Sequence, residues 1–481
     1  MTKYILSAAT WTAIWAVWAA MPATAQTIEW EPYAYEMRDG TEVTDAERGT
    51  LVVPESHMKP GGPSISLAMI RFRSTASSPG APVVWLAGGP GDYGSDDIEG
   101  PYLELVRAFQ SVADVIALDQ RGTGLSVPRL DCPEDAVDLP FDRPIDIDEM
   151  IAAYQEVSRR CADHWAAQGV DLTAYNTVES TEDLEALRKA LGAKKITLYG
   201  GSYGTHLGLA AIRRHGDRIE SALLSGVEGP DHTWKLPSVI ETHFSEVARA
   251  GGGRNVPGLM RHVLDRLDTE PVTVDLGEGQ QIMLGSDDLR LANRFFLGDM
   301  DNIRNLPAIY EALDAGDFGL LAGVSARFRS ISVGSAMTYA MDCASGASEA
   351  RLSRIGDEAS APGSLVGRTL NAPFPDVCDA WPHRELGPGF RGPLQSDVPV
   401  LFVSGTLDGQ TRPTNVDELI PGFPNGRHLI VENASHQYLE FAVPGVVERM
   451  VAFLRGEKTG PLYVQAPALE FVVEESDDKE E

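Results

Sequence analysis

Short apolar runs alternate with amphipathic stretches along most of the chain. Runs rich in Val, Ile and Leu that end in turn residues predict buried strands, and they occur at residues 49–54, 64–73, 82–87, 112–119, 196–199, 219–225, 398–403 and 427–431. Apolar residues at helical spacing predict helices near several of them, at residues 180–187, 206–214 and 443–454. Apolar strands that alternate with helices are typical of a mostly parallel sheet covered on both faces, so the predicted fold class is α/β.

The alternation stops between residues 229 and 395. This segment carries helical patterns at 243–250, 259–267, 289–296 and 303–313 without strong strand periodicity, which predicts a helical cap inserted into the α/β core. The expected organisation is a signal peptide at 1–25, a first core part at 26–228, the cap at 229–395, a second core part at 396–460 and an acidic C-terminal tail at 461–481. Residues 27–48 are polar and turn-rich, and we expect them to form a surface segment that precedes the core.

The N-terminus has the composition of a secretory signal peptide. Lys3 precedes an apolar run at residues 4–20, and Ala23-Thr24-Ala25 is a small-residue cleavage site. Cleavage there leaves Gln26 as the mature N-terminus and predicts a periplasmic or secreted protein. An uncleaved membrane anchor is the alternative, and no later stretch of the sequence is long and apolar enough to span a bilayer.

The four cysteines fit an oxidising compartment, where disulfides form and persist. Three pairings are possible. We favour Cys132–Cys161 and Cys343–Cys378, because each pair lies within one local segment. The sequence has no CxxC spacing, Cys/His cluster, P-loop or dinucleotide-binding fingerprint, so we expect neither a metal nor another cofactor.

The formal net charge of −30 argues against nucleic acid or an anionic membrane surface as a partner. Hydrophobic and charged contents of 43% and 23% are ordinary for a globular protein. A charge of this sign bears on solubility and on the attraction of cationic ligands, not on the fold. We expect a small substrate, no nucleic-acid partner and no stable membrane anchor after signal cleavage, and the sequence does not predict an oligomeric state.

A serine between glycines follows the strand predicted at residues 196–199. Gly200-Gly201-Ser202-Tyr203-Gly204 fits the G-x-S-x-G pattern of a nucleophile elbow, with a helical pattern directly after it. The glycines allow the tight turn because a Cβ would block its backbone angles and close approaches. The turn exposes the Ser202 hydroxyl, and the helix N-terminus that follows favours a developing anion. Ser202 is therefore the predicted nucleophile, and a serine without function in a glycine-rich turn is the alternative.

A serine nucleophile needs a base, and the base needs a carboxylate that orients it. In this architecture both follow the serine in loops after late strands, the acid before the base. Asp408 and His436 follow the last two predicted strands in that order and are the predicted acid and base. Asp417 lies in a predicted helix and His428 at the start of a strand, which makes them weaker candidates.

Stabilising the oxyanion requires two preorganised donors. The amide of Tyr203, directly after the nucleophile, is the first, and the loop after the third predicted strand is expected to supply the second. In that loop, the glycines of Gly88-Gly89-Pro90-Gly91 leave the backbone amides uncovered by side chains, and Gly89 is the predicted donor. Asp119 and Arg121 close the neighbouring strand, and we expect them to brace this loop by charge-assisted hydrogen bonds.

These motifs resemble those of the α/β-hydrolase superfamily, and within it the proline iminopeptidase and tripeptidyl aminopeptidase branch of serine peptidases. The resemblance covers roughly residues 49–456. It rests on Ala87–Gly91, Asp119–Ser126, Gly200–Thr205, Gly405–Asp408 and Ser435-His436, with Cys378–Pro382 resembling the tripeptidyl branch. Ala87 departs from the pattern, because many members carry histidine at that position.

The resemblance implies an α/β-hydrolase fold and, without a cofactor, the release of N-terminal residues or short peptides, often with a preference for proline. It also implies that acidic groups near the cap bind the free amine of the substrate. Glu228 is a candidate for that role, with an ordinary loop glutamate as the alternative. The predicted function is an exported serine hydrolase, an aminopeptidase acting on small peptides; a carboxylesterase acting on small esters and a non-catalytic binding protein are the alternatives.

Overall fold

The computed structural model describes residues 28–40, 42–133 and 135–472. The expected signal peptide and the acidic residues 473–481 lie outside these ranges. None of the helices within them is sufficiently long and apolar to cross a membrane.

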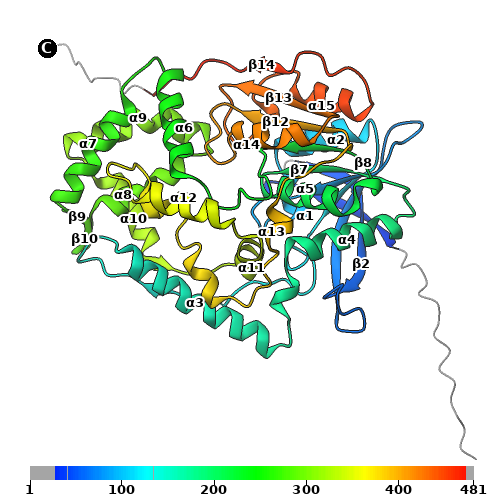
Figure 1. The fold of residues 1–481 in the computed structure, drawn as a ribbon, viewed down its shortest axis with the longest axis horizontal. Coiled ribbons are helices and arrows are strands. Elements are labelled where there is room, and N and C mark those ends of the chain that lie inside the picture. The colour runs from blue at the N-terminus through cyan, green and yellow to red at the C-terminus, as the bar shows by residue number, and fades with distance from the viewer. Residues whose placement is uncertain (1–27, 41, 134, 473–481) are drawn as a thin grey trace, which may run out of the picture.

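The main sheet has ten strands within the described residues, in the order β1-β2-β3-β5-β4-β7-β8-β12-β13-β14 (Figure 1). In this spatial order, neighbouring strands from β5 to β14 run parallel to each other. The neighbours from β1 to β5 run antiparallel. The strands are β1 (Glu29–Glu36), β2 (Val43–Pro54), β3 (Ser64–Phe72), β4 (Val83–Leu86), β5 (Val115–Leu118), β7 (Ile196–Gly201), β8 (Ile219–Ser225), β12 (Val400–Gly405), β13 (Gly426–Glu432) and β14 (Tyr463–Gln465). The fold class is therefore α/β, as predicted.

Helices cover both faces of this sheet because successive strand residues point to opposite sides. Val83 and Trp85 of β4 pack in the core that includes α2 (Pro101–Gln110) and α15 (Val446–Leu454). Val84 and Leu86 pack in the core that includes α4 (Thr177–Ala190) and α5 (Tyr203–His215). The helices of this α/β part are α1 (Gly94–Asp97), α2 (Pro101–Gln110), α3 (Ile147–Ala167), α4 (Thr177–Ala190), α5 (Tyr203–His215), α14 (Thr414–Leu419) and α15 (Val446–Leu454).

The segment between β8 and β12 is mostly helical and lies to one side of the main sheet (Figure 1). Its helices are α6 (Pro237–Ala250), α7 (Val256–Thr269), α8 (Ser286–Ala292), α9 (Met300–Ala315), α10 (Gly319–Phe328), α11 (Ala336–Ser345), α12 (Glu349–Ala359) and α13 (Pro388–Arg391). A separate apolar core, which includes Phe244, Met260, Ile303 and Tyr310, holds α6, α7 and α9 together. The boundaries of the cap at residues 229 and 395 stay a prediction.

This segment also contains strands that were not predicted. β9 (Val272–Gly277) and β10 (Gln280–Leu284) form an antiparallel hairpin. Glu278 and Gly279 join them with positive φ angles of 52° and 81°, the conformation that a tight hairpin turn requires. The hairpin signal is weak because glutamate seldom adopts such an angle. A short pair, β6 (Val137–Asp138) with β11 (Ser330–Ile331), links the segment to the core.

Residues 28–40 and 42–48, expected to form a polar, turn-rich surface segment before the core, lie mostly in strands β1 and β2 of the main sheet. β1 and the start of β2 pair antiparallel from Glu29↔Thr50 to Glu36↔Val43. Many of their side chains are exposed, and Tyr35 is one of the few that are buried. Backbone pairing at a sheet edge needs little apolar periodicity, which is why the polar sequence gave no strand signal.

Residues 461–472 of the predicted tail contain a strand and buried side chains. β14 adds an edge strand parallel to β13, with Ile430 opposite Tyr463. Beyond it, Leu469 is buried and Phe471 packs against the same apolar core as α6 and α7. Three residues of strand and isolated apolar side chains are too short a pattern to distinguish from a tail in the sequence.

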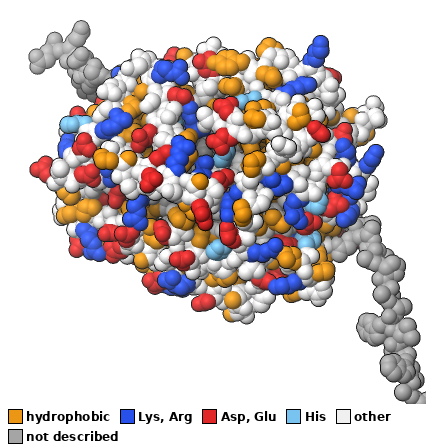
Figure 2. All heavy atoms as spheres, in the orientation of Figure 1, with side chains coloured by type: hydrophobic (Ala, Val, Ile, Leu, Met, Phe, Trp, Pro, Cys, Tyr) orange, Lys and Arg blue, Asp and Glu red, His pale blue; other side chains and the backbone are white. Residues whose placement is uncertain are grey.

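Both favoured disulfide pairings are confirmed. Cys132–Cys161 ties the loop after β5 to α3. Cys343–Cys378 ties α11 to the short 3₁₀ segment Asp376–Ala380. On the molecular face shown in Figure 2, acidic and basic side chains are interspersed, so the negative charge is not gathered there in one patch.

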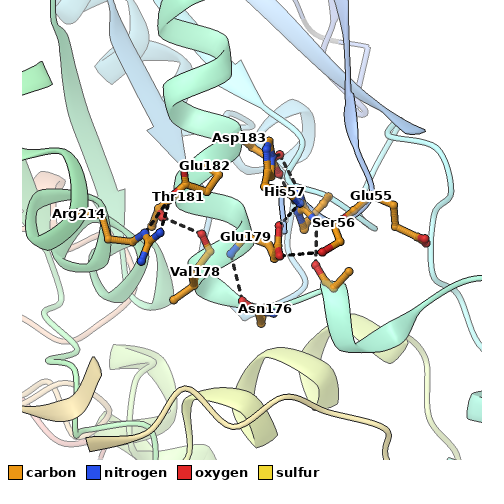
Figure 3. A network of polar contacts seen from close by, with 12 residues as sticks. Glu55, Ser56, His57, Asn176, Val178, Glu179, Thr181, Glu182, Asp183 and Arg214 are labelled. Atoms are coloured by element: carbon orange, nitrogen blue, oxygen red, sulfur yellow. Dashed lines mark hydrogen bonds and ion pairs between the residues drawn. The ribbon is translucent and has the colours of Figure 1, made fainter. Parts of the chain in front are cut away.

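Arg121 does not brace the glycine loop as expected. Its guanidinium is buried and makes two hydrogen bonds to Asp183 of α4, of 2.7 and 2.8 Å. The His57 ring also lies 2.8 Å from Asp183, and the His57 amide donates to Glu179 at 2.7 Å (Figure 3). This network fastens the loop after β2 to the start of α4, which begins at the Asn176 cap rather than at Ser180.

Candidate active site

Ser202 occupies a sharp turn between β7 and α5. Its φ angle is 50°, an angle that residues with a side chain seldom adopt. A Cβ on Gly204 would lie 2.1 Å from the carbonyl oxygen of Leu86, and one on Gly200 would lie 2.5 Å from the carbonyl oxygen of Gly204. Both motif glycines are therefore required, because backbone of the turn and of β4 occupies the space of a side chain.

Asp408 and His436 lie side by side because their strands are neighbours. β12 and β13 pair in parallel, with Gly405 opposite Val431, and the two loops leave the same edge of the sheet. His436 Nδ1 lies 2.8 Å from Asp408 Oδ2. Assigning the ring proton to Nδ1 makes this a hydrogen bond to the carboxylate and leaves Nε2 as the free basic nitrogen.

The pair is electrostatically coupled. Burial would raise the pKa of Asp408, but the charge of His436 and the hydrogen bonds from His436 and Thr411 lower it to about 2. Burial would likewise lower the pKa of His436, but the Asp408 carboxylate outweighs it and raises that pKa. Asp408 thus remains ionised and stabilises a protonated His436.

Thr411 contacts both Asp408 and His436, and sequence reasoning missed it. Its hydroxyl donates to Asp408 Oδ2 at 2.6 Å and lies 3.0 Å from His436 Nδ1. Its amide donates to Asp408 Oδ1 at 2.8 Å. The only signal in the sequence is a hydroxyl residue three positions after the acid, where it can bond back to the preceding aspartate.

The mostly helical segment supports both loops. The Gln437 amide donates to the Gly298 carbonyl at 3.0 Å, and the Gly409 amide donates to the Leu297 carbonyl at 2.7 Å. A Cβ on Gly298 would lie 3.3 Å from the Cβ of His436. This close packing limits where the His436 side chain can move.

Ser202 and His436 line one pocket of about 350 Å³, together with Gly88 and Gly89. A pocket of this size falls within the range of small-molecule sites. A larger pocket of about 580 Å³ on the other side of the His436 loop is lined by residues such as Asp299 and Tyr438, and by none of Ser202, Asp408 and His436.

The predicted oxyanion donors flank Ser202. Tyr203 is the first residue of α5, where backbone amides have no partner within the helix. Gly89 has a φ angle of 100°, and a Cβ there would lie 2.7 Å from the Gly91 nitrogen. The loop is held by the Thr338 hydroxyl, which donates to the Pro90 carbonyl at 2.7 Å. Both candidate donors therefore belong to backbone that is fixed in place.

Asp119 braces neighbouring backbone rather than the glycine loop itself. It accepts hydrogen bonds from the Ser95 amide at 2.8 Å and from the Leu125 amide at 2.7 Å. The contact to the glycine loop comes from the next residue, since Gln120 Nε2 donates to the Ala87 carbonyl at 3.2 Å. The expected support of the loop is thus shared between Gln120 and Thr338.

Residues 81–442 match the family described as the α/β-hydrolase fold. The chain belongs to the α/β-hydrolase family. Its described residues contain no group of three or more His, Cys, Asp or Glu side chains that could hold a metal ion.

Several relatives of this α/β hydrolase match part of the chain. Serine protease Hip1 of Mycobacterium tuberculosis is 31% identical over 220 residues, 44% of this chain and 42% of that protein. Tripeptidyl aminopeptidase of Streptomyces lividans is 28% identical over 230 residues, 45% of this chain and 41% of that protein. Carboxylesterase B of M. tuberculosis is 29% identical over 239 residues, 47% of this chain and 44% of that protein. The matched segments therefore span less than half of each relative.

The weaker candidates in this α/β hydrolase lie away from the pocket. Asp417 is on α14, and the His428 ring on β13 contacts the Ser404 hydroxyl at 3.1 Å. Glu228 is buried and lies 3.7 Å from His206 Nδ1, and it is not among the described residues that line the pocket with Ser202. A role for Glu228 in binding the substrate amine stays a prediction.

Acidic side chains instead reach this pocket from elsewhere in the hydrolase. Asp92, Asp97 and Glu440 line it beside Ser202. Burial raises the pKa of Asp97 to about 6; the charges of Asp92 and Glu440 add to this effect, and the hydrogen bond from Trp85 opposes it. Sequence reasoning missed these three carboxylates, because none belongs to a motif and only packing brings them together.

Proposed function

We propose that this chain is an exported serine hydrolase, an aminopeptidase that releases N-terminal residues or short peptides. The proposal rests on one observation above all, the 2.8 Å contact between Asp408 and His436 beside the pocket that holds Ser202. Acid, base and nucleophile follow the strands of one parallel sheet in the order that this architecture requires.

In the proposed reaction, His436 Nε2 takes the proton of the Ser202 hydroxyl as its oxygen attacks the scissile carbonyl carbon. The amides of Gly89 and Tyr203 stabilise the oxyanion of the tetrahedral intermediate. The carbonyl re-forms, the C–N bond breaks, and the leaving amine takes the proton from His436. Water then attacks the acyl-enzyme, with His436 as base again, and releases the acid and Ser202.

The relatives support a peptidase and also keep an ester substrate open. Two of the three reported relatives are named a serine protease and a tripeptidyl aminopeptidase, and one is named a carboxylesterase. The same triad cleaves esters and amides, so the residues of the reaction centre do not separate the two functions. A carboxylesterase acting on small esters is therefore the second candidate.

Export is supported by the two disulfides, which persist in oxidising compartments. The signal peptide itself lies outside the described residues. The intact mass of protein recovered from a periplasmic extract tests this part. A mature chain that begins at Gln26 agrees with it, and a retained N-terminus contradicts it.

The catalytic part is tested with purified mature protein and Ser202→Ala. The substrates are a proline amide with a free N-terminus, its N-acetylated twin, a free-amine tripeptide amide and a short acyl ester. Amide cleavage that requires the free amine and disappears in Ser202→Ala supports an aminopeptidase. Ester cleavage alone, indifferent to the amine, contradicts the peptidase proposal and leaves the carboxylesterase. Fluorophosphonate labelling of Ser202 shows whether the serine is nucleophilic in either case.

A further inference from the structure

The pocket beside Ser202 has an acidic wall that the proposed reaction does not use. Asp92, Asp97 and Glu440 line it together with Ser202 and His436, and no lysine or arginine of the described residues does so. Three carboxylates gathered in one pocket are unfavourable as anions, because like charges repel and burial penalises each of them. A positively charged group bound beside these carboxylates would therefore lower their electrostatic free energy.

Glu440 carries the most specific sign of such an occupant. The residue is only 3% exposed. Its Oε1 atom accepts a hydrogen bond of 3.0 Å from the Tyr199 hydroxyl. Its Oε2 atom is buried and has no hydrogen-bond partner in the part of the chain that the structure describes. A buried carboxylate oxygen without a donor is costly and uncommon, which indicates that something absent from the free protein supplies the donor.

The surroundings fix the orientation of the Glu440 side chain. Burial, followed by the charge of Glu440, raises the pKa of Tyr199 well above its usual value, so the tyrosine stays protonated and donates. Glu440 lies in the short 3₁₀ turn Leu439–Phe441 directly after the His436 loop. The second oxygen is thus carried by the segment that also positions the predicted base.

Asp97 forms the second part of the wall. Its Oδ2 atom accepts a hydrogen bond of 2.6 Å from Trp85 Nε1, and its pKa of about 6 reflects burial together with the charges of Asp92 and Glu440. A cation placed among these carboxylates would offset the repulsion between them and favour the ionised form of Asp97. Trp85 and Tyr199 contact each other with ring centroids 4.1 Å apart, so the donors to Asp97 and Glu440 pack against each other.

We propose that this pocket binds a cationic nitrogen of the substrate, an ammonium group carried by the residue whose carbonyl Ser202 attacks, with Glu440 as the anchoring carboxylate and Asp97 as its partner. The proposal rests on the proposed function, because it takes Ser202 as the nucleophile. The ammonium comes either from a free N-terminus or from a lysine side chain, and both present the same N–H donors and charge. Glu228, the acid singled out by the resemblance, is not part of this pocket.

The first test compares matched benzyl esters, so that it does not depend on amide cleavage. One pair is the ester of N-acetyl-lysine and that of N-acetyl-norleucine, which differ in the side-chain ammonium. The other pair is the ester of alanine and that of N-acetyl-alanine, which differ in the α-ammonium. We expect the cationic member of one pair to be preferred in kcat/KM by roughly 10- to 150-fold, the range of a hydrogen bond to a charged group.

Glu440→Gln should reduce this preference about 10-fold or more, because the amide keeps the shape and loses the charge. Asp97→Asn is expected to cause the same loss of preference. It provides the test if Glu440→Gln folds poorly. Glu448→Gln on the exposed side of α15 is the matched control, with the same change of charge, and should keep the wild-type ratio. A wild-type ratio within twofold of one for both pairs, or an unchanged ratio in both variants, overturns the proposal.

A binding measurement separates this inference from the proposed function. Calorimetric titration of Ser202→Ala with alaninamide and N-acetyl-lysinamide, and with their neutral analogues, needs no turnover. Weaker binding of the cationic compound in Ser202→Ala/Glu440→Gln supports the pocket even if no amide is cleaved. Equal binding of charged and neutral compounds overturns it, even if Ser202 proves to be the nucleophile.

Discussion

Thr411→Val removes one hydroxyl from the contact between Asp408 and His436 and changes little of the side chain's shape. That hydroxyl donates to Asp408 Oδ2 at 2.6 Å and lies 3.0 Å from His436 Nδ1. Thr411 is 2% exposed and Asp408 is fully buried. Water therefore has poor access to replace the lost donor, and the carboxylate keeps His436 as its side-chain partner.

The expected size of the effect follows from the chemistry of this bond. A hydrogen bond to a charged group contributes about 1.5–3 kcal/mol, and about 1.4 kcal/mol corresponds to a tenfold change in rate. We expect Thr411→Val to lower kcat/KM by roughly 10- to 150-fold. Most of the loss should appear in kcat, because in the proposed reaction the Asp408 carboxylate stabilises the imidazolium that forms only as Ser202 loses its proton.

The assay measures initial rates for one cleavable substrate with wild type, Thr411→Val and Thr411→Ser. The serine variant keeps the hydroxyl and is expected to recover most of the activity. Circular dichroism and thermal unfolding confirm that the variants are folded. A folded Thr411→Val enzyme within twofold of wild type would refute the reasoning, as would equal losses in the valine and serine variants.

Four further outcomes follow from the structure. Because Asp408 raises the pKa of His436 above 6.5 and only the neutral ring accepts a proton, kcat/KM should fall as pH drops through a midpoint above 6.5. Asp408→Asn should move that midpoint down in a pH–rate profile; an unmoved midpoint argues against the assignment. Asp183→Asn breaks the buried pair with Arg121 and should cost about 3–5 kcal/mol in urea unfolding, against about 0.5 kcal/mol for exposed Asp357→Asn. Replacing Cys132 and Cys161 by serine opens a loop of sequence separation 29 and should cost about 3–4 kcal/mol by the same measurement. Gly204→Ala should destabilise the fold strongly, since its Cβ would lie 2.1 Å from the Leu86 oxygen, whereas Gly201→Ala, whose Cβ meets nothing within 4 Å, should unfold near the wild-type midpoint.

Features that lie within one strand-and-turn unit could be predicted from the sequence. Ser202 is recognisable because the glycines that its turn requires are two residues away on either side, so the constraint is local. Asp408 and His436 could be placed because each directly follows a buried strand, and parallel strands end at one edge of a sheet. The helical segment before β12 was visible as the place where the alternation of strand and helix stops.

Features that depend on packing between distant segments could not be predicted. The β1–β2 pair is held by backbone hydrogen bonds at an edge, and its polar side chains carry no strand periodicity. Arg121 was assigned to the wrong partner because its guanidinium reaches Asp183, 62 positions away along the chain. Thr411 gave only the weak signal of a hydroxyl near an acid, which is common in turns.

The same distinction separates reaction class from substrate choice in this hydrolase. The proposed triad of Ser202, His436 and Asp408 would serve ester and amide cleavage alike, and a sequence with these residues in this order predicts no more than that. Selectivity in a pocket of this kind depends on which polar groups the substrate must pair, and under our proposal that group is the second oxygen of Glu440, which has no donor within the described residues. Glu440 is one of 70 acidic residues in the chain, and only the position of Tyr199 and Asp97 around it distinguishes it from the others. A chain with the same motifs and a neutral residue at position 440 would give the same prediction from its sequence, yet we expect it to lose the preference for a cationic substrate.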